Sequence, residues 1–294
     1  MTPDIIPVAA REAYARASAC FKERQFVESI VHAEAAVALC PDWPTPWWGL
    51  TVGYKHARRW QDALHACDRA IALDPDDCEG PRWNAGIAAT ALAQWPRARA
   101  AWASLGIAVP AGDGPIVMAL GPTPVRISPD DNPEVVWCDR IDPCRARIRS
   151  IPLPDSGRRY DDLLLHDGEA RGYRRIGDKR TAVFDELEVL EESTFGTWEI
   201  VVRCGGPEAL DALVSPLRDA ELPVEDWTEN LQALCAACSL GEPDHEHHDP
   251  EGDDSDWESE RTLGVAARSQ SQLAPLRRAH FWWRREVISV RQVL

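Results

Sequence analysis

The chain has 294 residues, 45% hydrophobic and 27% charged, and these proportions are typical of a folded globular protein rather than a disordered or fibrous one. Its 48 acidic and 32 basic side chains give a formal net charge of -16, which excludes a general binder of nucleic-acid phosphates or of anionic membranes. The length suits two domains of about 100–200 residues each.

The N-terminus carries no sign of a targeting segment. Residues 1–10 contain no basic side chain and no long apolar run. No stretch of the sequence approaches the run of about 20 apolar residues that a membrane span needs. The nine cysteines are an odd number scattered along the chain, which favours reduced thiols and possible metal ligands over a disulfide framework. We therefore expect a cytoplasmic protein without a membrane partner.

The first third of the chain contains an internal repeat. Pro41, Pro75 and Pro110 are 34 and 35 residues apart, and an aromatic residue lies fifteen positions before each of them: Phe26, Trp60 and Trp95. Two marks that recur together at one period indicate stacked helical repeats.

The middle copy shows the helical spacing most clearly. Trp47, Leu50 and Tyr54 fall on one face of a helix, and Ala63, Cys67 and Ala70 fall on one face of a second helix that Pro75 ends. The third copy keeps Gly86, Trp95, Ala98, Trp102 and Pro110, whereas the first has Ala13 at the position of the large aromatic and Ser29 at the position of an alanine. Residues 10–110 on this basis resemble the tetratricopeptide repeat family.

The resemblance implies a curved solenoid whose first helices hold a peptide or helix of a protein partner. The residues expected to contact the partner are Trp43, Trp48, Lys55, Arg58 and Arg59, although Trp48 would equally suit the core. The alternative is that residues 8–110 only support the rest of the chain, because a fold alone does not fix a function.

Beyond Pro110 the helical period stops. Glycine and proline between residues 111 and 130 predict a linker, and short β-rich runs between 131 and 194 predict a small antiparallel sheet or barrel. The expected strands are Val125–Ile127, Glu134–Cys138, Ala146–Leu153, Asp162–His166, Thr181–Phe184 and Leu187–Leu190. His166 with Asp167 could form half of a catalytic dyad, but a turn is the better interpretation.

Residues 195–294 predict two βαβ halves. Strands are expected at Trp198–Arg203, Leu222–Trp227, Arg261–Ala267 and Glu286–Val293, with helices at Glu208–Ala220 and near Gln270–Ala279. This order suggests a ferredoxin-like module. The predicted fold class is therefore α+β and multidomain: an α-solenoid, a small β region, and this module with an insert at 228–260.

The insert holds a candidate metal site. Cys235 and Cys238 are expected on the last turn of a helix, and a short loop returns three imidazoles, those of His245, His247 and His248. This donor set suits a structural zinc ion. The alternatives are that the two cysteines are core residues and that the histidines belong to a solvated loop.

The insert also carries most of the net charge. Residues 219–260 contain 15 acids and no base, so the rest of the chain has 33 acids against 32 bases. Such an acidic run is usually a solvated loop. A more specific interpretation is that it contacts a basic protein partner. The spacing does not match a calcium loop.

The sequence contains no catalytic signature: a P-loop, GxGxxG, GxSxG and HExxH are all absent. We therefore expect a non-enzymatic adaptor that uses its repeats and a zinc-stapled C-terminal module to bind proteins. The alternatives are an immunity or antitoxin protein whose acidic insert blocks a basic partner, a module that senses a small molecule, and a metal-dependent enzyme.

Overall fold

The computed structural model describes residues 6–176, 179–232, 257–275 and 286–294. Contacts divide the chain into two compact units. The helical unit comprises the residues up to Ala119 and Ile141–Cys144, and the β unit comprises Leu120–Arg140 and Arg145–Leu294.

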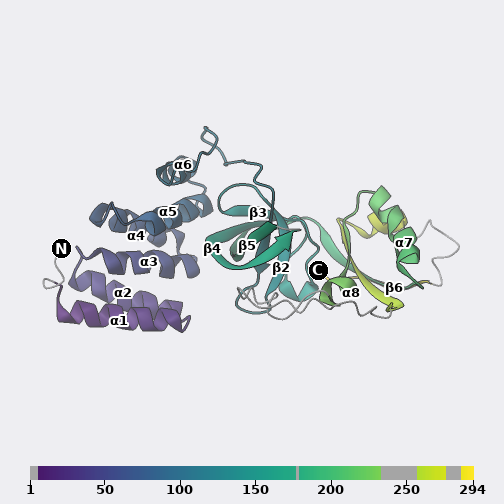
Figure 1. Cartoon of the computed structure of the whole chain (residues 1–294), viewed down its shortest axis with the longest axis horizontal. Helices are drawn as coiled ribbons and strands as arrows, with labels where there is room; N and C mark the ends of the chain where they lie inside the picture. The colour runs from purple at the N-terminus through teal and green to yellow at the C-terminus, as the bar shows by residue number, and fades with distance from the viewer. Residues whose placement is uncertain (1–5, 177–178, 233–256, 276–285) are drawn as a thin grey trace. The chain divides into compact units, whose positions relative to one another are not determined.

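Six helices build the helical unit, and Figure 1 shows them stacked in sequence order. Their bounds are α1 Val8–Lys22, α2 Phe26–Leu39, α3 Pro44–His56, α4 Trp60–Leu73, α5 Glu79–Ala91 and α6 Trp95–Ser104. The periodic aromatics Phe26, Trp60 and Trp95 are the first residues of the second helix in each pair. The predicted three helix pairs are therefore confirmed.

The turn inside each pair repeats with the same period. Arg24, Arg58 and Ala93 adopt φ values of 60°, 56° and 54°, in the left-handed region. In each turn the following residue donates its N–H to the carbonyl five positions earlier, as Arg59 does to Tyr54 at 2.9 Å. A helix ending with a left-handed residue and this backbone hydrogen bond is a Schellman motif. Because the motif recurs, the three helix pairs turn with the same geometry.

Small residues allow the helices of a pair to pack closely. Ala63 and Ala70, predicted on one helix face, are 0% and 3% exposed. Gly86 of α5 lies against the ring of Trp102 in α6, so closely that a Cβ on this glycine would lie 2.5 Å from the ring. The buried hydroxyl of Ser29, which stands where an alanine was expected, donates to the Ala17 carbonyl at 2.9 Å.

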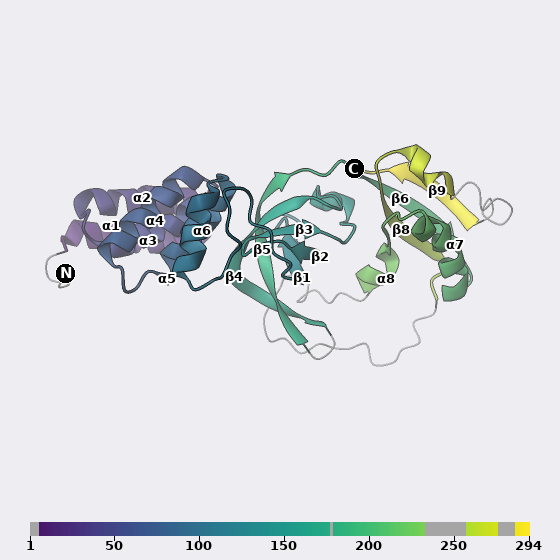
Figure 2. The same cartoon turned by 90° about the horizontal axis from the view of Figure 1, so that it is seen from above.

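The middle region is a closed five-stranded barrel, visible around β1–β5 in Figure 2. Its strands are β1 Pro122–Ile127, β2 Glu134–Arg140, β3 Arg145–Ile148, β4 Leu163–Ile176 and β5 Lys179–Glu191. Neighbours are antiparallel except β1 and β5, which close the barrel in parallel with Val125 opposite Phe184. The apolar interior contains Val125, Ile127, Val136, Cys138, Ala146, Ile148 and Leu164.

The strand expected at Val125–Ile127 lies within β1, which begins earlier, at Pro122, because a proline suits the first position of a strand. Two other details of the barrel differ from the prediction. Strand β3 ends at Ile148 rather than Leu153, and the chain then turns through a short 3₁₀ helix at Pro154–Ser156. The strand expected to end at His166 continues as β4 to Ile176, so His166 and Asp167 lie within a strand of irregular register and not in the expected turn.

Among the described residues, the C-terminal sheet has four antiparallel strands in the order β7-β8-β6-β9. They are β6 Gly196–Arg203, β7 Val224–Asp226, β8 Glu260–Ala267 and β9 Val287–Gln292. Helix α7, Pro207–Asp219, packs Leu213, Val214 and Leu217 onto the sheet core. A short helix α8, Trp227–Gln232, follows β7, and Gln270–Leu273 forms a 3₁₀ turn within the expected helix near Gln270–Ala279.

Two glutamates of the β unit approach the loop that follows β3. Glu134 of β2 accepts the Leu153 N–H at 3.0 Å, and Glu225 of β7 bonds to Ile151 and Ser150. Burial raises the pKa of Glu134 to about 7. The hydrogen bond from Leu153 lowers this pKa, and the charge of Glu225 raises it. Burial likewise raises the pKa of Glu225.

Substitution of Glu134 with glutamine is expected to stabilise the β unit at pH 8. The native pKa lies above the ordinary value of 4.5, so ionisation lowers stability as pH rises from about 4.5 to about 7. Glutamine still accepts the Leu153 N–H and cannot ionise, so the gain should be about 2 kcal/mol at pH 8 and should shrink towards pH 4.5. Urea unfolding at both pH values tests this, with Glu208→Gln on the exposed start of α7 as control. Equal pH dependence in both variants would contradict the assignment.

Candidate functional site

The helical unit contains a groove between the first helices of two consecutive pairs. It has a volume of about 200 Å³ and is lined by residues of α1, α2 and α3: Tyr14, Ala17, Ser18, Phe21, Ser29, Ala33, Trp48, Gly49 and Val52. Its walls are α1 and α3, and Ser29 and Ala33 of α2 form its floor. We call these nine residues the groove.

Two glycines shape the groove. A Cβ on Gly49 would lie 3.0 Å from the Tyr14 ring, so this glycine lets α1 and α3 approach. A Cβ on Gly80 of α5 would lie 3.0 Å from Nε1 of Trp48, so the indole rests on the surface of α5. Trp48 is nevertheless 45% exposed, which leaves much of its ring open to solvent.

Of the predicted partner contacts, Trp48 is the one that lines the groove. Trp43 immediately precedes α3, and its half-buried ring stands edge-on to the Tyr14 ring with centroids 5.3 Å apart. Trp43 therefore packs against a residue of the groove without lining the groove itself.

The three predicted basic contacts lie elsewhere. Lys55 is 6% exposed and is buried within the helix stack, so it offers little surface to a partner. Arg58 is the left-handed residue of the turn after α3 and is exposed there. Arg59 stacks over Tyr54 at 4.5 Å and pairs with Asp62 at 2.7 Å and Glu34 at 3.7 Å.

Tyr14 and Phe21 of the groove were not predicted from the sequence. Ala13 stands at the position where the first repeat was expected to have its large aromatic, whereas the adjacent Tyr14 lines the groove. Tyr14, Ala17 and Phe21 have the spacing of one helix face, and this spacing was the signal that could have found them.

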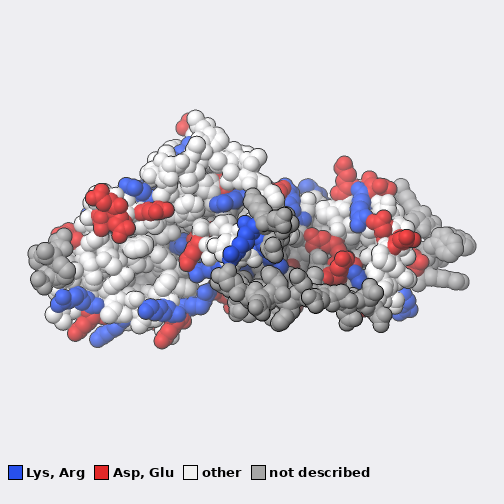
Figure 3. Space-filling view, viewed as in Figure 1, with Lys and Arg blue, Asp and Glu red and all other residues white. Residues whose placement is uncertain are grey.

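Charge is mixed around the helical unit. Residues 1–110 have 12 acids and 11 bases, and Figure 3 shows side chains of both signs interspersed over the helices in that view. The groove itself is lined by aromatic, aliphatic and small side chains. The surface that the groove offers is therefore more apolar than charged.

The predicted zinc ligands Cys235, Cys238, His245, His247 and His248 lie outside the described residues, as does most of the acidic run. Within the ranges that the structure describes, no three Cys, His, Asp or Glu side chains gather in a way that could hold a metal ion. The zinc site therefore stays a prediction.

Metal analysis of the purified chain should find one equivalent of zinc, and the double substitution Cys235→Ser/Cys238→Ser should remove it. A wild-type protein without zinc would contradict the prediction.

His166 is fully buried in β4 and stacks on Phe184 with ring centroids 5.1 Å apart. Its Nδ1 lies 2.7 Å from the Asp167 carbonyl, while the Asp167 carboxylate accepts the Gly168 N–H at 2.7 Å. Burial, aided by the charge of Arg140, lowers the pKa of His166 to about 4. The Asp167 carboxylate thus bonds to the local backbone within a strand rather than in the expected turn, and the imidazole is shielded from solvent.

The seven cysteines in the described ranges are free thiols. Among the helices that the structure describes, none has the length and apolar character needed to cross a bilayer.

No family model and no curated protein matches the chain. Among solved structures, the Arabidopsis OM64 TPR domain is 18% identical over 33% of this chain and 81% of that domain, with a TM-score of 0.32. The first TPR of Spaghetti (RPAP3), bound to the HSP90 peptide SRMEEVD, is 18% identical over 33% of this chain and 76% of that one, with a TM-score of 0.32. A chain of the CopN-Scc3 complex is 20% identical over 32% of this chain and 55% of its own, with a TM-score of 0.31.

The 34- and 35-residue period, the three helix pairs and the recurring turn are the features of this chain that resemble tetratricopeptide repeats.

Proposed function

We propose that this protein is an interaction adaptor whose groove binds an apolar side chain from a peptide or helix of a protein partner. The observation that carries the proposal is the open aromatic groove between α1 and α3, with Trp48 45% exposed at its edge. Large aromatic side chains in such positions commonly dominate the energy of a protein interface.

The dimensions of the groove favour a single anchor. Its volume of about 200 Å³ suits one large apolar side chain rather than a whole helix face. Ser18 and Ser29 are its hydroxyl-bearing residues besides Tyr14, and the Ser29 hydroxyl is already bonded to the Ala17 carbonyl. We infer a partner segment that inserts one Leu, Met or aromatic residue.

Replacement of Trp48 with alanine is expected to weaken partner binding by more than about ten-fold, because truncating a central aromatic anchor costs about 2 kcal/mol or more. Random peptides displayed on phage can be selected on the full chain and their affinity measured by titration. A second variant, Ser18→Phe, should weaken the same peptides by filling the groove while Trp48 remains.

The matched control is Val27→Ala, since Val27 is 66% exposed on α2 and does not line the groove. Peptides selected on the wild type should bind this variant unchanged. Failure to enrich any apolar peptide, or equal losses in all three variants, would contradict the proposal.

We also infer that the C-terminal sheet belongs to a ferredoxin-like module that offers a second surface. Its strand order β7-β8-β6-β9 and the placement of α7 between β6 and β7 support this interpretation. On this interpretation the helices capture the partner, and the β unit serves a separate recognition event.

A further inference from the structure

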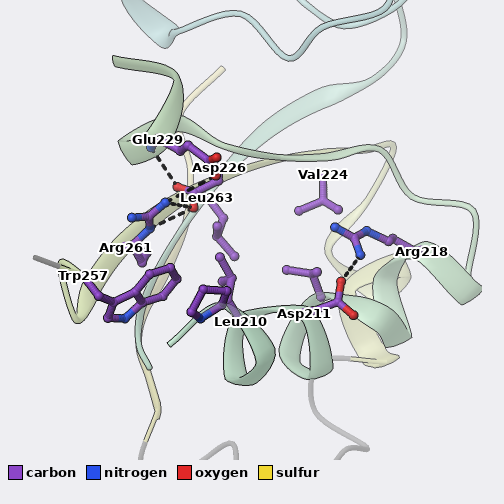
Figure 4. Close-up of a pocket in the computed structure, with 11 residues that line it drawn as sticks. Leu210, Asp211, Arg218, Val224, Asp226, Glu229, Trp257, Arg261 and Leu263 are labelled. Carbon is purple, nitrogen blue, oxygen red and sulfur yellow. Dashed lines mark hydrogen bonds and ion pairs between the residues drawn. The ribbon is translucent and has the colours of Figure 1, made fainter. Parts of the chain in front are cut away.

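The C-terminal sheet carries a second cavity. It has a volume of about 450 Å³ and opens between α7, β7, α8 and the start of β8. This volume is typical of small-molecule sites. Figure 4 shows side chains from all four elements around it.

The middle of the cavity is apolar. Leu210 and Val214 of α7 face Val224 of β7 and Leu263 of β8, and these four residues also belong to or pack on the core of the sheet. Trp257 adds an indole ring at one end. Its Nε1 already donates to the Cys204 carbonyl at 2.7 Å, so its remaining surface toward a ligand is apolar.

One ion pair beside the cavity is structural. Arg261 is 5% exposed, pairs with the Asp226 carboxylate and lies over the Trp257 ring at 4.6 Å. The other Asp226 oxygen accepts the N–H groups of Thr228 and Glu229 at the start of α8. These contacts neutralise Arg261 and Asp226, so neither is available to a ligand charge.

The accessible charges are unequal. Glu229 is exposed, and its carboxylate lies 3.6 Å from Arg261, a cation that Asp226 already balances. At the opposite end, Arg218 of α7 pairs with Asp211, and both are exposed. Among the described residues that line the cavity, three are acidic and two are basic, which leaves one negative charge at the Glu229 end.

From this arrangement we propose that the cavity binds a small organic ammonium compound, with its cationic group at Glu229 and its hydrocarbon part on Leu210, Val214 and Leu263. A cation restores charge balance at the Glu229 end, whereas an anion would meet uncompensated negative charge there. A neutral molecule would gain the apolar contacts alone.

A set of ligands with one chain length tests the preferred charge. The full chain is titrated with pentylamine, pentan-1-ol and pentanoate, and binding is followed by ligand-observed NMR. Pentylamine should bind with a dissociation constant on the order of millimolar, as its few heavy atoms allow, and at least about five-fold more tightly than the other two. Equal or tighter binding of pentan-1-ol or pentanoate, or no detectable binding of pentylamine, overturns the proposal.

The variant Glu229→Gln locates the site. Because Glu229 is exposed, the substitution should leave the fold intact, and it should weaken pentylamine about five-fold without changing pentan-1-ol binding. Asp219→Asn, which removes an exposed acid of α7 outside the cavity, is the matched control and should bind pentylamine as the wild type does. If both variants behave alike, the amine responds only to the overall negative charge of the chain and the cavity is not its site.

Discussion

Replacement of Trp227 with alanine should lower the free energy of unfolding of the β unit by about 4 kcal/mol, as for other buried tryptophans. The side chain is 4% exposed and packs with Ile151 and Ala266 in a small cluster between the barrel loop and the C-terminal sheet. Its Nε1 donates to the Ile151 carbonyl at 2.9 Å. Truncation would leave a cavity and a buried carbonyl without its donor at the same time.

The close packing of Gly264 on Trp227 allows a second substitution to test the same contact. Gly264 of β8 lies directly against the indole, closer than any Cβ could approach, so Gly264→Ala should destabilise the same cluster without removing the ring. Trp227→Phe should lose less than Trp227→Ala, because most of the ring remains while the hydrogen bond does not.

Hydrogen exchange of the full chain measures the effect where it should occur. Peptides from 148–153 and 260–267 should lose protection in Trp227→Ala, while α1–α6 should exchange as in the wild type. Unchanged protection in those two segments would show that the cluster contributes little, and loss across both units would indicate general misfolding instead.

The helical unit could be predicted from the sequence because its repeat presents each contact three times. The aromatic at the start of the second helix and the proline after it recur at Phe26, Trp60 and Trp95 and at Pro41, Pro75 and Pro110. Close packing of stacked helix pairs requires small residues at fixed positions. Because these positions recur at a fixed period, they can be recognised from the sequence without knowledge of long-range contacts.

The barrel was predicted only as an alternative to an open sheet, because closure depends on one distant pairing. Val125 lies opposite Phe184, 59 positions later in the chain, and neither strand carries a local signal of the other. Alternation of apolar residues predicts that a strand exists, and it does not specify which strand is its neighbour.

The same limit applies to the candidate site. Lys55 was expected to contact a partner, but it is buried because α3 contacts α1, α2, α4 and α5 and few of its faces remain open. The C-terminal cavity could not be predicted, since Asp226 and Arg261 are 35 positions apart and their pairing, which leaves Glu229 as the surplus charge, exists only in the folded sheet.

Replacement of Gly86 with valine should destabilise the helical unit by about 3 kcal/mol or more. Three atoms of the Trp102 ring lie 2.5–2.6 Å from the position of a Cβ on Gly86, and Trp102 is 0% exposed, so the ring has no open space to move into. Overpacking of this kind costs about 1–3 kcal/mol, and a β-branched side chain adds further bulk. The gain in helix propensity on leaving glycine is below about 1 kcal/mol and does not offset the clash.

A double substitution separates the clash from other effects. In Gly86→Val/Trp102→Leu the smaller partner should accept the valine, so the double variant should be more stable than the sum of the single losses predicts, with a coupling of about 1–3 kcal/mol. The control is Ala93→Gly, which changes an exposed turn without touching Trp102. Gly106→Val would not serve, because Gly106 has a φ of 73° in the left-handed region. Thermal unfolding followed by circular dichroism of the helical signal gives the comparison. Strictly additive losses would mean that the contact between Gly86 and Trp102 does not set the spacing of α5 and α6, and that the third helix pair is held together by other residues.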